Sequence, residues 1–140
     1  MISHSRTTAW QPPPGPDALA MPVGEDWDAI KVRRDYGIVA MSFLGEASGA
    51  VMGDPYGGCF YFLIPPNSGM DWSFPEAARV VHLSVACWVT VPPRERCRPP
   101  GPHWVVPFRE GRYLADPRRL HEALASITGL VSSPREREQR

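Results

Sequence analysis

Apolar residues occur along the chain in short segments that proline and glycine separate. Six of these segments have the length of strands: 27–32, 48–52, 59–64, 79–84, 86–91 and 103–106. The longer segment 33–44 has mixed periodicity and is followed by Gly45, which predicts a helix that ends at a glycine. Residues 116–128 carry apolar side chains at helical spacing, so we predict a second helix there.

The strongest local pattern is a hairpin formed by 48–52 and 59–64. The residues between them, 53–58, contain an Asp-Pro step and a Gly-Gly pair, which are typical of a tight turn. The second segment has the sequence CFYFLI, is apolar on both faces and is followed by two prolines. We therefore expect it to be a central strand of a sheet.

Individual residues predict how the loop after the hairpin packs and where the second helix begins and ends. Trp72 and Phe74 lie in the loop after the hairpin, and aromatic side chains in a loop predict that the loop packs on the core. Asp116 precedes Pro117 at the start of the second helix, as expected for an Asp cap with proline in the first turn. Gly129 is expected to end that helix.

The predicted elements favour an α+β fold. Their order is strand, helix, two strands, a loop, three strands and a helix, which suits a two-layer domain with a mainly antiparallel sheet of four or five strands and two helices. The 140 residues are enough for one domain, which we expect over 25–130. Residues 1–24 are predicted to be a disordered proline-rich leader, and residues 131–140 a disordered charged tail.

The leader also has a second interpretation. Residues 11–16 have the sequence QPPPGP, which favours extended polyproline-like backbone because proline fixes φ and lacks an N–H donor. Such a segment can bind in an aromatic groove or cross the domain as a strap, and Trp10 would be its anchor.

The composition excludes several classes of protein. The chain has 17 prolines and 12 glycines, but its net charge of +0 gives no repulsion that would hold it unfolded. The same balance excludes a polybasic nucleic-acid tail, and the sequence has no coiled-coil character. No apolar run approaches the length of about 18 residues that a transmembrane helix needs, so no membrane partner is expected.

Cysteine and arginine usage suggest where the protein works. Cys59, Cys87 and Cys97 are an odd number without the spacing of a disulfide framework. The first 22 residues lack the apolar run of a secretory signal, so we expect a cytoplasmic location. Of the 15 basic residues only Lys31 is a lysine, a bias that indicates the GC-rich codons of a high-GC bacterium.

Two aspartates and a histidine are one candidate for catalysis. Asp26 and Asp28 would face the same side of a strand and could share a divalent metal ion, with His82 as a further ligand. Phosphoryl-transfer enzymes hold magnesium with such pairs. Both aspartates stand at the beginning of an apolar segment, which favours exposed turn residues instead. No zinc spacing, nucleophile motif, P-loop or dinucleotide motif is present, and we predict no cofactor.

Basic and aromatic residues suggest a binding surface. Arg94, Arg96 and Arg98 lie close in sequence to Trp104, and basic residues interleaved with aromatic ones can follow a phosphate backbone while a base stacks. His103 and Arg109 also lie around Trp104, and three more arginines would extend this surface if the fold brings them close: Arg112, Arg118 and Arg119. A solvated loop is the simpler interpretation, because acidic neighbours dilute the charge.

Three motifs within residues 51–107 have counterparts in one known family. The segment 54–62 is a glycine-pair hairpin leading into an aromatic strand, and 80–83 with 88–93 resembles paired strands ending in a double proline. A Gly-x-x-Trp element follows at 101–104. By these motifs the region resembles the second half of the bacterial and plasmid primase-polymerase domain.

The resemblance implies that the fold is kept without its catalytic residues. The family has a catalytic histidine after the glycine pair, where this chain has Cys59 and Phe60, and an aspartate where it has His82. The family's aspartate pair closes a strand, whereas Asp26 and Asp28 precede one. Two-metal phosphoryl transfer needs such carboxylates. The resemblance therefore implies an inactive domain that keeps a groove for a nucleotide or a single strand.

Two functions are therefore candidates. The first is a non-catalytic accessory or regulatory domain that binds a protein partner or single-stranded nucleic acid. Its expected contact residues are Tyr56, Gly57, Gly58, Tyr61, Trp88, Arg94, Arg96, Arg98 and Trp104. The second is a small metal-dependent phosphoryl-transfer enzyme that uses Asp26, Asp28 and His82. The sequence predicts no particular oligomeric state.

Overall fold

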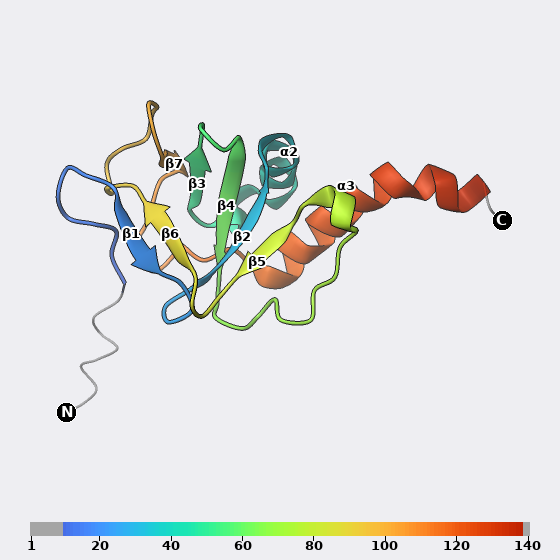
Figure 1. Ribbon diagram of the computed structural model, residues 1–140, viewed down its shortest axis with the longest axis horizontal. Helices are drawn as coiled ribbons and strands as arrows, with labels where there is room; N and C mark the ends of the chain where they lie inside the picture. The colour runs from blue at the N-terminus through green and yellow to red at the C-terminus, as the bar shows by residue number, and fades with distance from the viewer. Residues whose placement is uncertain (1–9, 139–140) are drawn as a thin grey trace.

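The protein has three layers: two helices, a five-stranded sheet and a two-stranded sheet (Figure 1). The structure is a computed structural model that describes residues 10–138, the last nine of them as backbone alone. The predicted α+β class, with a mainly antiparallel sheet and two helices, is confirmed. The two-stranded sheet is an additional layer that the sequence did not predict.

The five-stranded sheet is antiparallel throughout, with the strand order β5-β2-β4-β3-β7. Its strands are β2 (Asp28–Arg33), β3 (Val51–Asp54), β4 (Cys59–Ile64), β5 (Val81–Leu83) and β7 (His103–Val106). The predicted hairpin is β3–β4, and the CFYFLI segment is confirmed as the central strand β4. The last strand, β7, lies at an edge as its flanking prolines predicted.

Two helices cover one face of this sheet: α2 (Arg34–Leu44) and α3 (Pro117–Glu138). Leu44 of α2, Leu124 of α3 and Phe62 of β4 belong to one buried cluster between helices and sheet. The loop after β4 packs on the same cluster, as its aromatic residues predicted. Burial of these apolar side chains holds the helical layer on the sheet.

The opposite face of the five-stranded sheet is partly covered by the second sheet, in which β1 (Leu19–Pro22) pairs with β6 (Trp88–Val91). Val91 of β6 packs with Trp27 and Trp104 in a second buried cluster. The five-stranded sheet therefore has an apolar core on each face, which explains why β4 is apolar on both sides.

Residues 10–16, which we name the proline strap, lie against this second cluster. The ring centroid of Trp10 is 5.4 Å from that of Trp27, 5.6 Å from that of Phe108 and 5.4 Å from that of Tyr113. Aromatic pairs at such spacings stabilise a structure beyond the area that they bury. Trp10 is thus the anchor of the strap.

The predicted domain boundary at residue 25 is wrong, because residues 10–24 are part of the folded domain. Side chains hold the strap where its prolines cannot form ladder hydrogen bonds. Arg94 Nη1 donates to Gln11 Oε1 at 3.1 Å, and Arg96 Nη2 donates to the Pro16 carbonyl at 2.7 Å. The part of the predicted leader over 1–9 lies outside the described residues.

Strands β5 and β6 follow one another but do not pair, contrary to the paired strands that the resemblance implied. β5 pairs with β2 in the large sheet, whereas β6 pairs with β1 in the small one. A turn from Ser84 to Cys87, with Ala86 at a φ of 72°, joins them. This turn carries the chain from one sheet to the other.

The predicted cap of α3 is confirmed and carries a prediction. Asp116 Oδ1 accepts hydrogen bonds from the backbone N–H groups of Arg118, at 3.1 Å, and Arg119, at 3.3 Å. Replacing Asp116 with alanine is expected to lower the free energy of unfolding by about 1 kcal/mol, because two helix N–H groups lose their acceptor. Urea denaturation measures this loss.

Arg118→Ala is the matched control for that substitution. Arg118 is exposed, and its Nε lies 4.0 Å from Glu122 Oε2, a spacing at which a surface ion pair adds little. We expect the free energy of unfolding of this variant to lie within about 0.5 kcal/mol of that of the parent protein. Equal losses in the two variants would contradict the capping role of Asp116.

The predicted end of α3 at Gly129 is wrong, because the helix continues to Glu138. Gly129 has no positive φ, which a glycine that terminates a helix usually needs. The predicted tail over 131–140 is therefore helical backbone as far as 138, and residues 139–140 lie outside the described residues. Across residues 10–138, no helix combines the length and hydropathy that spanning a bilayer requires.

Candidate functional site

The second sheet leaves part of the five-stranded sheet uncovered, and we name this part the open face. Lys31 of β2 stands opposite Tyr61 of β4, and Arg33 stands opposite Cys59. Val32, between the two cations, is buried in the cluster beneath the helices. Because side chains alternate along a strand, the two cations and their two partners share the outer side of the sheet.

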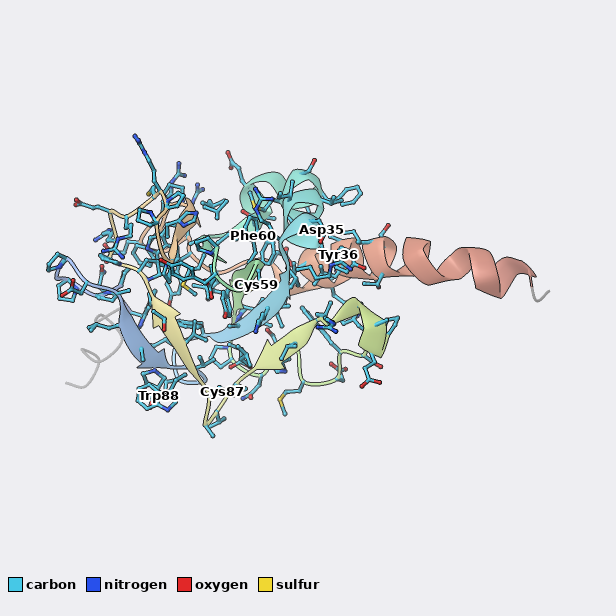
Figure 2. The ribbon with its side chains drawn as sticks, turned by 45° about the horizontal axis from the view of Figure 1, so that its top comes forward. Asp35, Tyr36, Cys59, Phe60, Cys87 and Trp88 are labelled. Atoms are coloured by element: carbon cyan, nitrogen blue, oxygen red, sulfur yellow. The ribbon has the colours of Figure 1, made fainter. Side chains whose placement is uncertain are left out.

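Tyr61 and Trp88 meet at a small cavity of about 160 Å³ between the open face and β6. Trp88 is 64 % exposed and projects away from its strand (Figure 2). Tyr61 is half-buried; burial raises its pKa, and the neighbouring Cys59 thiol adds to the effect. The Tyr61 hydroxyl therefore stays protonated at neutral pH, and the exposed Trp88 ring is available for stacking.

Cys59 lies beside Tyr61 and is a weak nucleophile. Burial raises the pKa of the Cys59 thiol, an effect larger than the opposing influence of its hydrogen bond with Tyr61 and of the Lys31 charge. A thiol that stays protonated is neither a good nucleophile nor a good metal ligand. The open face is therefore suited to contact rather than to covalent chemistry.

A basic groove of about 900 Å³ adjoins the open face. It lies where β5 begins. Because β5 pairs with β2 only over 29–31, the last two residues of β2 have no strand partner on that edge. Its polar lining comes from Lys31 and Arg33, from Gly57 and Gly58, and from Glu76 and Arg79. Three cations therefore face one carboxylate.

The charges in the basic groove are only partly compensated. Arg33 forms an ion pair with Asp35, at 2.7 Å, and lies over the Tyr36 ring, 4.5 Å from its centroid. Across the described residues 10–138, neither Lys31 nor Arg79 takes part in an ion pair. Arg79 also has the left-handed φ of 56°, which is uncommon for a residue with a side chain. The groove suits an anionic ligand.

The β3–β4 turn holds Tyr56 next to this groove. Asp54 Oδ1 accepts hydrogen bonds from the backbone N–H groups of Tyr56, at 3.0 Å, and Gly57, at 3.3 Å. The Gly58 carbonyl accepts a hydrogen bond from the Arg34 N–H, at 3.0 Å, which ties the turn to the start of α2. Tyr56 is 79 % exposed on this fixed turn.

Asp28 is the centre of a buried polar network on the other side of the sheet. It has no exposed surface, and its Oδ2 accepts a hydrogen bond from the Asn67 N–H, at 2.9 Å, and lies 2.8 Å from His82 Nε2. Its Oδ1 accepts from the Ser84 hydroxyl at 3.0 Å. Both carboxylate oxygens are therefore occupied by groups of the protein.

The metal site predicted from Asp26, Asp28 and His82 is not assembled. Asp28 and His82 do meet, but Asp26 is exposed and precedes β2, so it does not follow the alternation of that strand. Asp26 instead adds to the effect of burial in raising the pKa of Tyr113. Within residues 10–138 no three His, Cys, Asp or Glu side chains are grouped to hold a metal ion.

Trp104 was predicted to be a contact residue, but it is completely buried. Its indole Nε1–H donates to the carbonyls of Pro92, at 3.2 Å, and Pro93, at 3.1 Å. A proline carbonyl remains an acceptor although its nitrogen cannot donate. The double proline after β6 therefore serves to position a core tryptophan, and no base could stack on that ring in the folded protein.

The arginines of the predicted surface are divided among different places. Arg94 and Arg96 hold the proline strap, and Arg94 also lies 4.9 Å from the centroid of the Phe108 ring. Arg98 is exposed in the loop before β7. Arg109 and Arg112 line a separate pocket, away from the open face. The arginines thus do not form the single patch that their sequence spacing suggested.

The chain matches no family model, no curated protein and no solved structure. The resemblance to the primase-polymerase domain therefore stays a prediction. Four of the predicted contact residues line the site that the fold brings together: Gly57, Gly58, Tyr61 and Trp88. Tyr56 is exposed on the turn beside it. Lys31 and Arg33 were not among the predicted contact residues, although their alternation within one strand was a signal for them.

Proposed function

We propose that this protein is a non-catalytic binding domain that holds single-stranded nucleic acid on the open face and in the basic groove. The observation that carries the proposal is that aromatic rings line one cavity beside the open face, and cations that form no ion pair within residues 10–138 line the adjoining groove. Tyr61 and Trp88 line one cavity, and Lys31 lies opposite Tyr61 and opens into the groove with Arg79. Sheet surfaces bind single strands in this way, with bases stacked on rings and cations along the phosphates.

The chemistry of the surface supports binding without catalysis. Asp54 is the carboxylate that lines the Trp88 cavity, and its Oδ1 is occupied by the backbone of the turn. Asp28 and His82 bind each other on the opposite side of the sheet, away from the open face. The carboxylates that phosphoryl transfer would need are thus not gathered where a single strand would lie.

Fluorescence anisotropy of a labelled oligo(dT) tests the proposal. We expect binding at micromolar protein concentration and low salt, with affinity falling as salt rises, because cations displace counterions from phosphates. Trp88→Ala is expected to weaken binding about tenfold, since stacking of one base contributes about 1–3 kcal/mol. Arg79→Ala is expected to reduce the slope of log affinity against log salt concentration by about one, because one phosphate contact is lost.

Two substitutions elsewhere are matched controls. Phe43→Ala removes an exposed aromatic ring from α2, and Arg119→Ala removes an exposed arginine from α3. Both lie on the helical side of the molecule, so neither should change the affinity for oligo(dT). If oligo(dT) does not bind at low salt, or if the controls weaken binding as much as Trp88→Ala does, the proposal is wrong.

A further inference from the structure

A second cavity, of about 520 Å³, lies at the C-terminal end of α2, and we name it the α2-end pocket. One wall is the short helix η1 (Gly45–Ser48), which follows α2 directly, and the other is the segment after β7. None of the residues that line the open face or the basic groove lines this pocket. It is therefore a separate site.

The two walls of the α2-end pocket are fixed to each other by backbone contacts. The Ala50 N–H donates to the Tyr113 carbonyl, and the Asp116 N–H donates to the Ala47 carbonyl, both at 3.0 Å. Gly49, with a φ of 65°, packs so closely that a Cβ there would lie 2.6 Å from the Tyr113 oxygen. A glycine is thus required at this point, and the pocket is preformed.

The pocket has a negative side, where α2 ends. The last carbonyls of a helix carry the partial negative charge of the helix dipole, and a basic residue in the last turn usually offsets it. The last turn of α2 contains no basic residue. Glu46, one residue beyond the cap at Gly45, adds a full negative charge to the same wall.

The pocket has a positive side on the opposite wall. Arg109 and Arg112 lie in one turn, in which the Arg112 N–H donates to the Arg109 carbonyl at 2.9 Å and Gly111 has a φ of 78°. In the part of the chain that the structure describes, neither arginine forms an ion pair with Glu46 or with any other carboxylate. Opposite charges therefore line one cavity without neutralising each other.

We propose that the α2-end pocket binds a small zwitterion, a free amino acid with an apolar side chain. Its ammonium group pairs with Glu46 and the α2 carbonyls, and its carboxylate pairs with the two arginines. Guanidinium groups match planar carboxylates in shape and charge. A simple anion would pair with the arginines but be repelled by Glu46, and a simple cation would pair with Glu46 but be repelled by the arginines. Met41, Val106 and Leu114 supply the apolar surface for the side chain.

Isothermal titration of the full-length protein with L-leucine and L-phenylalanine tests this proposal. Isocaproate lacks the ammonium group of leucine, and isoamylamine lacks its carboxylate. We expect each of these two analogues to bind at least about tenfold more weakly than leucine, because each leaves one charged wall without a partner. Arg112→Ala and Glu46→Gln should weaken leucine binding to a similar extent, and both side chains are exposed, so the variants should fold.

Arg118→Ala, an exposed arginine outside the pocket, is the control and should leave leucine binding unchanged. Equal binding of leucine and isocaproate would show a plain anion site and overturn the proposal, as would the absence of binding by both amino acids at millimolar concentration. The proposal does not depend on nucleic-acid binding. Arg112→Ala should keep the parent affinity for oligo(dT), so the two proposals can fail separately.

Discussion

Replacing Asp28 with alanine is expected to lower the free energy of unfolding by about 3–5 kcal/mol, the usual cost of removing one partner from a buried charged network. Asp28 has no exposed surface and is the common acceptor for Ser84, Asn67 and His82. Without it, the Asn67 N–H, the His82 ring and the Ser84 hydroxyl would all lose the one buried acceptor that they share. Urea denaturation followed by far-UV circular dichroism measures the loss.

Asp26→Ala is the matched control for Asp28→Ala. The two aspartates are two residues apart, but Asp26 is exposed and precedes β2. An exposed substitution of this kind should change the free energy of unfolding by no more than about 0.5 kcal/mol. A loss below about 1 kcal/mol for Asp28→Ala would show that the network contributes little to stability.

Replacing Trp10 with alanine is expected to lower the free energy of unfolding by about 2–4 kcal/mol. Trp10 touches Trp27, Phe108 and Tyr113, but it is partly exposed, so the loss should lie below the upper range for a buried tryptophan. The strap should also lose its anchor, which would free Arg94 and Arg96 from their contacts with it. Urea denaturation gives the energy, and near-ultraviolet circular dichroism reports the loss of aromatic packing.

Trp88→Ala is the matched control, because it removes the same side chain from an exposed position. Trp88 is 64 % exposed on β6, and its loss should change the free energy of unfolding by no more than about 0.5 kcal/mol. Equal effects of the two tryptophan substitutions would mean that the strap adds nothing to stability. The stable domain would then begin at β1 rather than at the strap.

The elements that the sequence predicted well are those with strong local signals. The β3–β4 hairpin combines a dense turn with a continuous apolar strand, and the start of α3 combines an aspartate cap with a proline. In both cases neighbouring residues decide the structure, so the pattern along the chain is sufficient. The length of α3 was not predicted, because Gly129 keeps helical backbone instead of the cap that glycine favours.

The elements that the sequence did not predict depend on residues far apart along the chain. The proline strap has no apolar periodicity, and it is held by an aromatic cluster and by Arg94 and Arg96. The separation of β5 and β6 into two sheets follows from their pairing with β2 and β1, which no local pattern specifies. A polyproline segment is read as disordered unless its docking surface is known.

Only some residues of the candidate site could be predicted, because the position of the others depends on strand register and on tertiary packing. Tyr61 and Trp88 stand out as aromatic residues of strands, but only strand register places Lys31 opposite Tyr61. Trp104 looked equally exposed in sequence, and its burial depends on two proline carbonyls that accept its indole hydrogen. Residue type identifies candidates for contact, whereas the tertiary structure decides which of them face solvent.

The pairing of β1 with β6 has a consequence for how the chain folds as it is made. Leu19 pairs with Val91, so β1 waits for a partner that is synthesised about 70 residues later. The strands β2 to β5 and helix α2 are complete before that partner emerges, and they can form much of the large sheet without it. Closing a loop of this length is slow relative to local pairing. Strand β1 is therefore made well before β6 and docks late, and a nascent chain released before β6 would carry it unpaired.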